Sequence, residues 1–175
     1  MRMKSRHVMP IAVALLGAAI LASCTKQTES EPDVVVSQRA AECMARAMYF
    51  ESIRSSRDGM IAVGSVVMNR VESEAYPATV CDVVAQRGQF APGVMTRQMG
   101  DRSVPLAREA AVSVLSGERH PEVADAKFFH AANYRAGYNN MHYVLVAGGN
   151  AFYEKRPPEL VTQPTPPRPA QGATP

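Results

Sequence analysis

Two glutamates, Glu42 and Glu51, share the segment AAECMARAMYFE, and their spacing gives them different surroundings. If this segment is a helix that turns about 100° per residue, its apolar residues recur at i, i+3, i+4, i+7 and i+8 and form one stripe that leads to Glu51. Glu42 points to the opposite side, where Arg46 one turn later can pair with it. The members of the stripe are Ala40, Cys43, Met44, Ala47 and Met48.

Glu51 therefore has the position of a catalytic acid. A carboxyl at the end of an apolar stripe resists ionisation, so we expect the pKa of Glu51 to be raised above its usual range. A carboxyl that stays protonated near neutral pH can serve as a general acid. A second interpretation stays open, in which the helix end frays and Glu51 turns into water.

Other residue types that carry chemistry are less well placed. The acids Asp58 and Asp82 suit helix caps or surface charges better than the role of a second catalytic carboxylate. The histidines His120, His130 and His142 lie ten and twelve residues apart and form no HExxH motif. We therefore expect neither a metal site nor a cofactor.

The elements that must position Glu51 are predicted to be four helices, from their apolar period and their end residues. The second is apolar over most of its circumference, so we expect it to be the central buried helix. The four stretches are 40–51 after Ser37, about 59–72 after Ser55, Ser56 or Asp58, 80–86 after Thr79, and 105–116 from Pro105 to Gly117.

Short alternating runs from Lys127 onward predict three strands, at 128–130, 141–146 and 151–154. The pair Gly148-Gly149 favours a hairpin turn between the last two. This order predicts an α+β fold, mainly helical, with a small antiparallel β-sheet toward the C-terminus.

The first residues have the pattern of a targeting segment, because a basic start is followed by an apolar run too short for a membrane span. The run ends in LASC, which resembles a bacterial lipobox, in which Cys24 is acylated and becomes the first mature residue. With Thr25 next to it, this predicts a lipid anchor on the periplasmic side of the outer membrane. An ordinary secretory peptide is the alternative.

The rest of the chain divides by composition into a polar stretch, a domain and a Pro-rich end. We expect a signal peptide at 1–24, a tether at 25–36, the folded domain at 37–156 and a disordered tail at 157–175.

The formal charge of +3 arises from Arg2, Lys4 and Arg6, because the rest of the chain holds 16 basic and 16 acidic residues. No basic stripe is visible, so we expect no nucleic-acid partner. An exported chain meets an oxidising compartment, where Cys43 and Cys81 are candidates for a disulfide. Two buried free thiols are the alternative.

Six short motifs occur in order: MYFES, VVMNR, YPATVCDVV, GQF, FFHA and FY. Over about residues 42–155 this order resembles the cell-wall hydrolase family named after the spore-cortex-lytic enzyme (SleB-like). The resemblance implies a lysozyme- or lytic-transglycosylase-like domain, peptidoglycan as the substrate and Glu51 as the catalytic acid. It also indicates substrate-binding roles for Tyr49, Asn69, Gln89, Phe90, His130 and Tyr138.

The chain also departs from that family's pattern. Ala91-Pro92 follow Gln89-Phe90 where the family continues with serine and tryptophan, Tyr138 or Gly137 stands near the place of a second tryptophan, and Asn150-Ala151 replace a histidine before FY. The chain contains no tryptophan, so a sugar platform has to be smaller, or built from Phe90, Tyr134 or Tyr138.

Two classes of function follow. With one acid and no partner carboxylate, the resemblance favours a lytic transglycosylase, in which one glutamate acts first as acid and then as base. The alternative is a lipid-anchored protein that binds peptidoglycan without cleaving it. An amidase, which has also been attributed to the family, would need zinc or an activated nucleophile.

Overall fold

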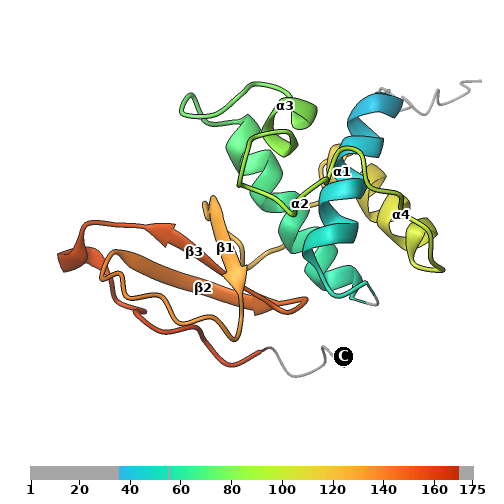
Figure 1. Cartoon of the computed structure of the whole chain (residues 1–175). Coiled ribbons are helices and arrows are strands. Elements are labelled where there is room, and N and C mark those ends of the chain that lie inside the picture. Colours follow the sequence, from blue (N-terminus) through green and yellow to red (C-terminus); the bar gives the residue numbers. More distant parts are fainter. Residues whose placement is uncertain (1–35, 55, 170–175) are drawn as a thin grey trace, which may run out of the picture. The chain divides into compact units, whose positions relative to one another are not determined.

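The computed structural model describes residues 36–54 and 56–169. Its helices precede its strands along the chain, and Figure 1 shows the helices grouped together with the sheet beside them. This confirms the predicted α+β class. The elements are α1 (Gln38–Glu51), α2 (Arg57–Val71), α3 (Val80–Val84), α4 (Val104–Leu115), β1 (Phe128–Ala131), β2 (Met141–Ala147), β3 (Asn150–Lys155) and a short 3₁₀ helix, η1 (Pro158–Leu160).

Side-chain caps fix the starts of three helices. Ser37, Ser56 and Thr79 each accept a hydrogen bond from a backbone N–H in the first turn of α1, α2 and α3 respectively. These bonds satisfy donors that a helix start leaves without an intrahelical partner. Helix α4 has a proline in its first turn instead, and Gly117 beyond its end takes a φ of 110°, which favours glycine.

Helix α2 is buried along nearly its whole length, as predicted for the central helix. It contacts α1, α3 and α4. Gly64 lies at a tightly packed point, because a Cβ atom there would overlap the side chain of Met48 in α1 and crowd that of Val114 in α4. The buried faces of these helices therefore form one core, to which the inner face of the sheet adds Leu145 and Phe152.

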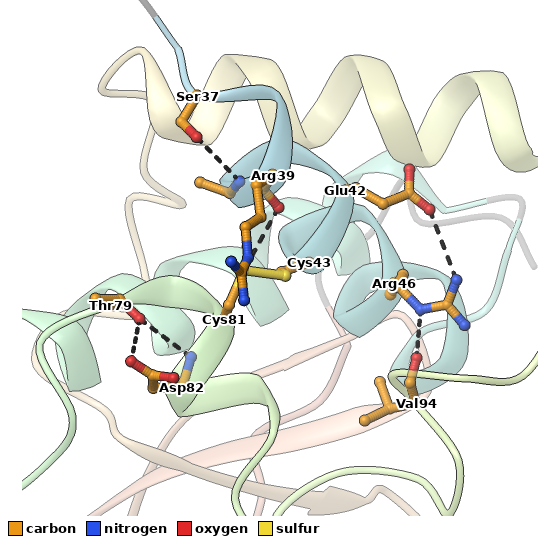
Figure 2. The surroundings of a disulfide bond; sticks show 10 residues. Ser37, Arg39, Glu42, Cys43, Arg46, Thr79, Cys81, Asp82 and Val94 are labelled. Carbon is orange, nitrogen blue, oxygen red and sulfur yellow. Dashed lines mark hydrogen bonds and ion pairs between the residues drawn. A yellow bond between two sulfur atoms is a disulfide. The ribbon is translucent and has the colours of Figure 1, made fainter.

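The predicted disulfide is present. Cys43 in α1 and Cys81 in α3 are joined, with their Cα atoms 5.2 Å apart, and Figure 2 shows the bond between the two helices. The bond links segments separated by 38 residues, and it ties the short helix α3 to the helix that carries Glu51.

The sheet is antiparallel in the order β1-β3-β2, with a bulge in β2. Tyr143 lies opposite Tyr153, whereas Leu145 lies opposite Phe152. Neighbouring residues of a strand point to opposite faces, so the bulge moves Leu145 to the face of Phe152, against the helical core. Tyr143 and Tyr153 lie on the other face, in a second apolar cluster with Met141.

The segment after β3, which is expected to form a tail that is disordered from residue 157, makes backbone contacts with the sheet in the structure. The backbone N–H of Tyr143 donates to the carbonyl of Gln163 over 2.9 Å, and the backbone N–H groups of Thr162 and Gln163 donate to Nδ1 of His142 over 3.3 Å. Residues 162–163 thus follow the outer edge of β2, where unpaired backbone groups of an edge strand need partners. The expected signal peptide, the tether up to residue 35 and residues 170–175 lie outside the described residues.

Candidate active site

Glu51 is the last residue of α1 and is held at two points. The apolar stripe that precedes it is fully buried at Met44 and Met48, and Glu51 itself is half-buried. The backbone N–H of Ala91 donates to its carboxyl oxygen Oε1, and Nδ2 of Asn150 donates to its backbone carbonyl over 2.5 Å. The carboxyl is therefore fixed by a loop, and the end of the helix by the sheet.

Opposing influences act on the Glu51 carboxyl. Burial raises its pKa, whereas the Ala91 N–H and the positive charges of Arg70 and Arg97 lower it, and the balance leaves the pKa raised. The direction predicted from the apolar stripe is thus correct. Glu42, on the other side of the helix, pairs with Arg46 at 3.6 Å, which Figure 2 shows beside the disulfide.

Arg70 is a buried cation close to this carboxyl. Arg70 is only 3% exposed, and its Nε donates to the carbonyl of Lys127 over 2.8 Å. The guanidinium lies 5.3 Å from the ring of Tyr76 and 5.4 Å from that of Phe90, at distances typical of cation–π contacts. Burial lowers the pKa of Arg70, and its Nη1 has no hydrogen-bond partner among the described residues.

The loop that supplies Ala91 is fastened to α1 by Arg46. Nε of Arg46 donates to the carbonyl of Val94 over 2.6 Å, and its Nη2 donates to the carbonyl of Arg97. The guanidinium of Arg97 in turn lies 4.1 Å from the centre of the Phe50 ring. Arg46 therefore does more than pair with Glu42, because it holds the loop beside the end of α1.

Two of the aromatic residues expected to bind substrate are buried instead. Tyr49 is 4% exposed, and its hydroxyl accepts a hydrogen bond from the N–H of Gly100. Phe90 is 8% exposed, its ring packs edge-on against Phe129, and the guanidinium of Arg70 lies 5.4 Å from the centre of the ring. These contacts support packing roles next to Glu51 rather than an exposed platform for sugar rings.

The polar residues predicted for binding differ in their surroundings. Nδ2 of Asn69 donates to the carbonyls of Ala124 and Ala126 over 2.8 and 2.9 Å, so its amide hydrogens fasten a loop to α2. Gln89 is exposed on the loop next to Ala91. Of the neighbouring residues Asn69 and Arg70, Arg70 is the one that acts on Glu51, because its positive charge lowers the pKa of the Glu51 carboxyl.

His130 belongs to an aromatic cluster on the outer face of the sheet. Its Nδ1 lies 2.9 Å from the carbonyl of Ala131, so this nitrogen carries the proton, and Nε2 accepts from the hydroxyl of Tyr143 at 2.8 Å. Tyr134 lies edge-on to the imidazole with its centre 5.3 Å away, and is 56% exposed. Tyr138, 74% exposed, lines a hollow at the far end of the same sheet.

Sequence reasoning missed two of the groups that hold Glu51. The family resemblance places Asn69 and Arg70, which end the VVMNR motif, near the site, but Asn150 lies 99 residues from Glu51 along the chain, and no local pattern links it to an acid. Ala91 acts through its backbone N–H, so the type of its side chain gives no indication of the contact.

No group of three His, Cys, Asp or Glu side chains that could hold a metal ion lies within residues 36–54 and 56–169.

A family model described as Cell Wall Hydrolase matches residues 54–153, more than half of the chain. The chain belongs to the cell wall hydrolase family. The matched range begins just after Glu51 and contains the other groups that contact its carboxyl and carbonyl, on Ala91 and Asn150. None of the helices in the described part of this cell wall hydrolase has the length and apolar content to cross a membrane.

This cell wall hydrolase is similar to the spore cortex-lytic enzyme of Oceanobacillus iheyensis, with 32% identity over 84 residues. The aligned residues make up 46% of this chain and 29% of the relative. The chain thus spans less than a third of that relative's length. The catalytic domain of the germination-specific lytic transglycosylase SleB from Bacillus anthracis has a TM-score of 0.56 at 24% identity, covering 69% of this chain and 98% of the other. The catalytic domain of Bacillus cereus SleB has the same score and identity, covering 67% and 91%. These likenesses show a shared fold.

Proposed function

We propose that this cell wall hydrolase cleaves the glycan strands of peptidoglycan as a lytic transglycosylase, with Glu51 as its single catalytic acid and base. One observation carries the proposal: Glu51 is half-buried at the end of an apolar stripe and has a raised pKa, while the Ala91 N–H and the charges of Arg70 and Arg97 favour its charged form. The relatives include a spore cortex-lytic enzyme and a lytic transglycosylase, and these names agree with this reaction.

The reaction begins with protonated Glu51. It donates its proton to the bridging oxygen of a glycosidic bond, the bond to the anomeric carbon breaks, and positive charge builds on that carbon. The glutamate left behind is a carboxylate, which accepts the Ala91 N–H and interacts with the charges of Arg70 and Arg97. These groups stabilise the negative charge at the moment when it forms.

The second step restores the acid. The Glu51 carboxylate takes the proton from the 6-hydroxyl of the muramyl residue, whose oxygen forms a bond to the anomeric carbon and closes an anhydro ring. No water enters and no second carboxylate is needed to position one. Burial favours protonated Glu51 and the two arginines favour its carboxylate, so the same surroundings serve both halves of the cycle.

We further propose that the exposed rings contact the glycan. Tyr134 and Tyr138 offer open faces of the kind on which sugar rings stack, and Gln89 is exposed two residues before Ala91, whose backbone N–H binds Glu51. His130 would support Tyr134 from behind, while Tyr49, Asn69 and Phe90 would act indirectly through packing. We also propose that acylated Cys24 holds the enzyme in the periplasm, at the outer membrane.

The experiment compares Glu51→Gln with Glu42→Gln on purified sacculi. Gln keeps the shape of Glu51 and removes its proton, so we expect turnover to fall by about 10²- to 10⁴-fold while binding to sacculi persists. Glu42→Gln is the matched control from the opposite side of the same helix and should leave turnover within a few-fold. Mass spectrometry of the released muropeptides should find anhydro products from wild type.

Three results would overturn the proposal. Equal release of muropeptides by wild type and Glu51→Gln would remove Glu51 from the mechanism. If neither protein releases products and both bind sacculi, the alternative of a peptidoglycan-binding protein without turnover replaces the enzyme. Products cut at the peptide amide rather than in the glycan would instead identify an amidase.

A further inference from the structure

The sheet reaches the end of helix α1 through the turn between β2 and β3. The carbonyl of Gly148 accepts the backbone N–H of Ile53 over 2.9 Å, on one side of Ser52. On the other side, Nδ2 of Asn150 donates to the carbonyl of Glu51 over 2.5 Å. The hairpin therefore binds the chain immediately before and after Ser52, the residue that follows the end of α1.

The turn between β2 and β3 packs tightly against helix α2. A Cβ atom added to Gly59 of α2 would collide with the backbone of Gly148, so the turn lies directly against the start of the next helix. Gly148 and Gly149 have φ values of 52° and 83°, a conformation that suits glycine. The hairpin is thus seated between the end of α1 and the start of α2.

Asn150 is the polar residue that this seating buries. It is 7% exposed at the first position of the central strand β3, which pairs with β1 and β2 on its two sides. The last carbonyls of a helix have no intrahelical partner, and the bond from Asn150 satisfies that of Glu51. An amide side chain facing a carbonyl must present its NH₂ group, so the direction of this bond is unambiguous.

We propose that Asn150 is a positioning residue for catalysis, because it fixes the backbone of Glu51 and so directs its carboxyl. Ala91 holds the carboxyl, and Asn150 holds the peptide group from which that side chain extends. The role rests on the proposed function of Glu51 as the acid. Loss of the bond would let the acid drift, and misplacement by about 1 Å can cost about 10²-fold in rate.

The test compares Asn150→Leu, which keeps the volume but removes the donor, with Asn150→Ala as a second variant in case the first fails to fold. Ser65→Ala is the matched control: Ser65 is 2% exposed, and its hydroxyl also ties two segments by accepting the N–H of His120 over 2.9 Å. All are made in the full chain, and folding is checked by circular dichroism and thermal melting.

With soluble peptidoglycan strands as substrate, we expect Asn150→Leu to lower kcat by about 10- to 100-fold and to change KM by less than about 3-fold. The Glu51 carboxyl signal in ¹³C NMR, identified by its loss in Glu51→Gln, should titrate with a changed midpoint. Ser65→Ala should lower the melting temperature similarly and leave kcat and this titration as in wild type.

A folded Asn150→Leu with the kcat and the Glu51 titration of wild type would overturn the positioning role and leave Asn150 a purely structural residue. If Glu51→Gln is as active as wild type, the proposed function fails, and the NMR comparison alone decides whether Asn150 positions Glu51. An unchanged titration then shows that Asn150 does not fix Glu51 either, whereas a changed one supports the fixing of Glu51 by Asn150 while the catalytic role is overturned together with the proposed function.

Discussion

Reduction of the Cys43–Cys81 disulfide should lower the free energy of unfolding of the domain by an amount that depends on the length of the loop that the bond closes. The bond closes a loop of 38 residues between α1 and α3. In the loop-entropy model, this restricts the unfolded chain by about 4 kcal/mol at 25 °C. For a domain of this size, that corresponds to a fall in Tm of roughly 10–15 °C. Glu51 lies eight residues beyond Cys43, about 12 Å along the helix, so activity below the transition should persist.

The measurement is urea unfolding of the oxidised and the reduced protein, both carrying Cys24→Ala so that Cys43 and Cys81 are the only cysteines. A variant with Cys43→Ala and Cys81→Ala is the control, because reductant should leave its unfolding midpoint unchanged. Coinciding midpoints for the oxidised and reduced protein would refute the stabilisation. A loss of turnover in the folded, reduced protein would contradict the view that the disulfide acts on stability alone.

Two further predictions concern Glu51 and Cys24. The pKa of Glu51 is raised in the folded state, mainly by burial, so wild type loses stability as the pH rises through that pKa. Glu51→Gln lacks this titration, and urea unfolding at about pH 4 and about pH 8 should show its stability relative to wild type increasing with pH; a constant difference would contradict the raised pKa. Cys24→Ala should release the protein from membrane fractions and abolish incorporation of labelled palmitate, whereas equal retention of the variant in membranes would exclude the anchor.

The parts of the fold that sequence could predict are those encoded by near neighbours. The caps Ser37 and Thr79 and the Gly148-Gly149 turn act within a few residues, so their types alone indicate where elements begin and turn. The stripe ending at Glu51 has the period of a helix, and that period also separates it from Glu42. The disulfide was predictable because the domain expected at 37–156 holds two cysteines.

The surroundings of Glu51 could not be predicted, because they depend on contacts between distant segments. Phe90 is buried against Arg70, which lies 20 residues earlier in the chain, and the GQF motif alone does not show whether its ring faces water or the core. The bulge in β2 reverses which residues face the helices, so alternation alone misplaces Leu145. The segment after residue 157 looks disordered by composition, yet Gln163 finds a backbone partner at the edge of β2.

Two of the three departures from the family's pattern leave the contacts of Glu51 in place, which favours an active enzyme over a protein that only binds. At position 91 the contact with Glu51 is made by the backbone N–H, which any residue except proline supplies, so alanine retains it and the proline stands one place later. At position 150 the contact needs a side-chain donor, and asparagine has one. Two substitutions that suggest lost turnover in a motif comparison therefore fall where the acid is still held, and the cationic surroundings of its carboxylate are also present in Arg70 and Arg97.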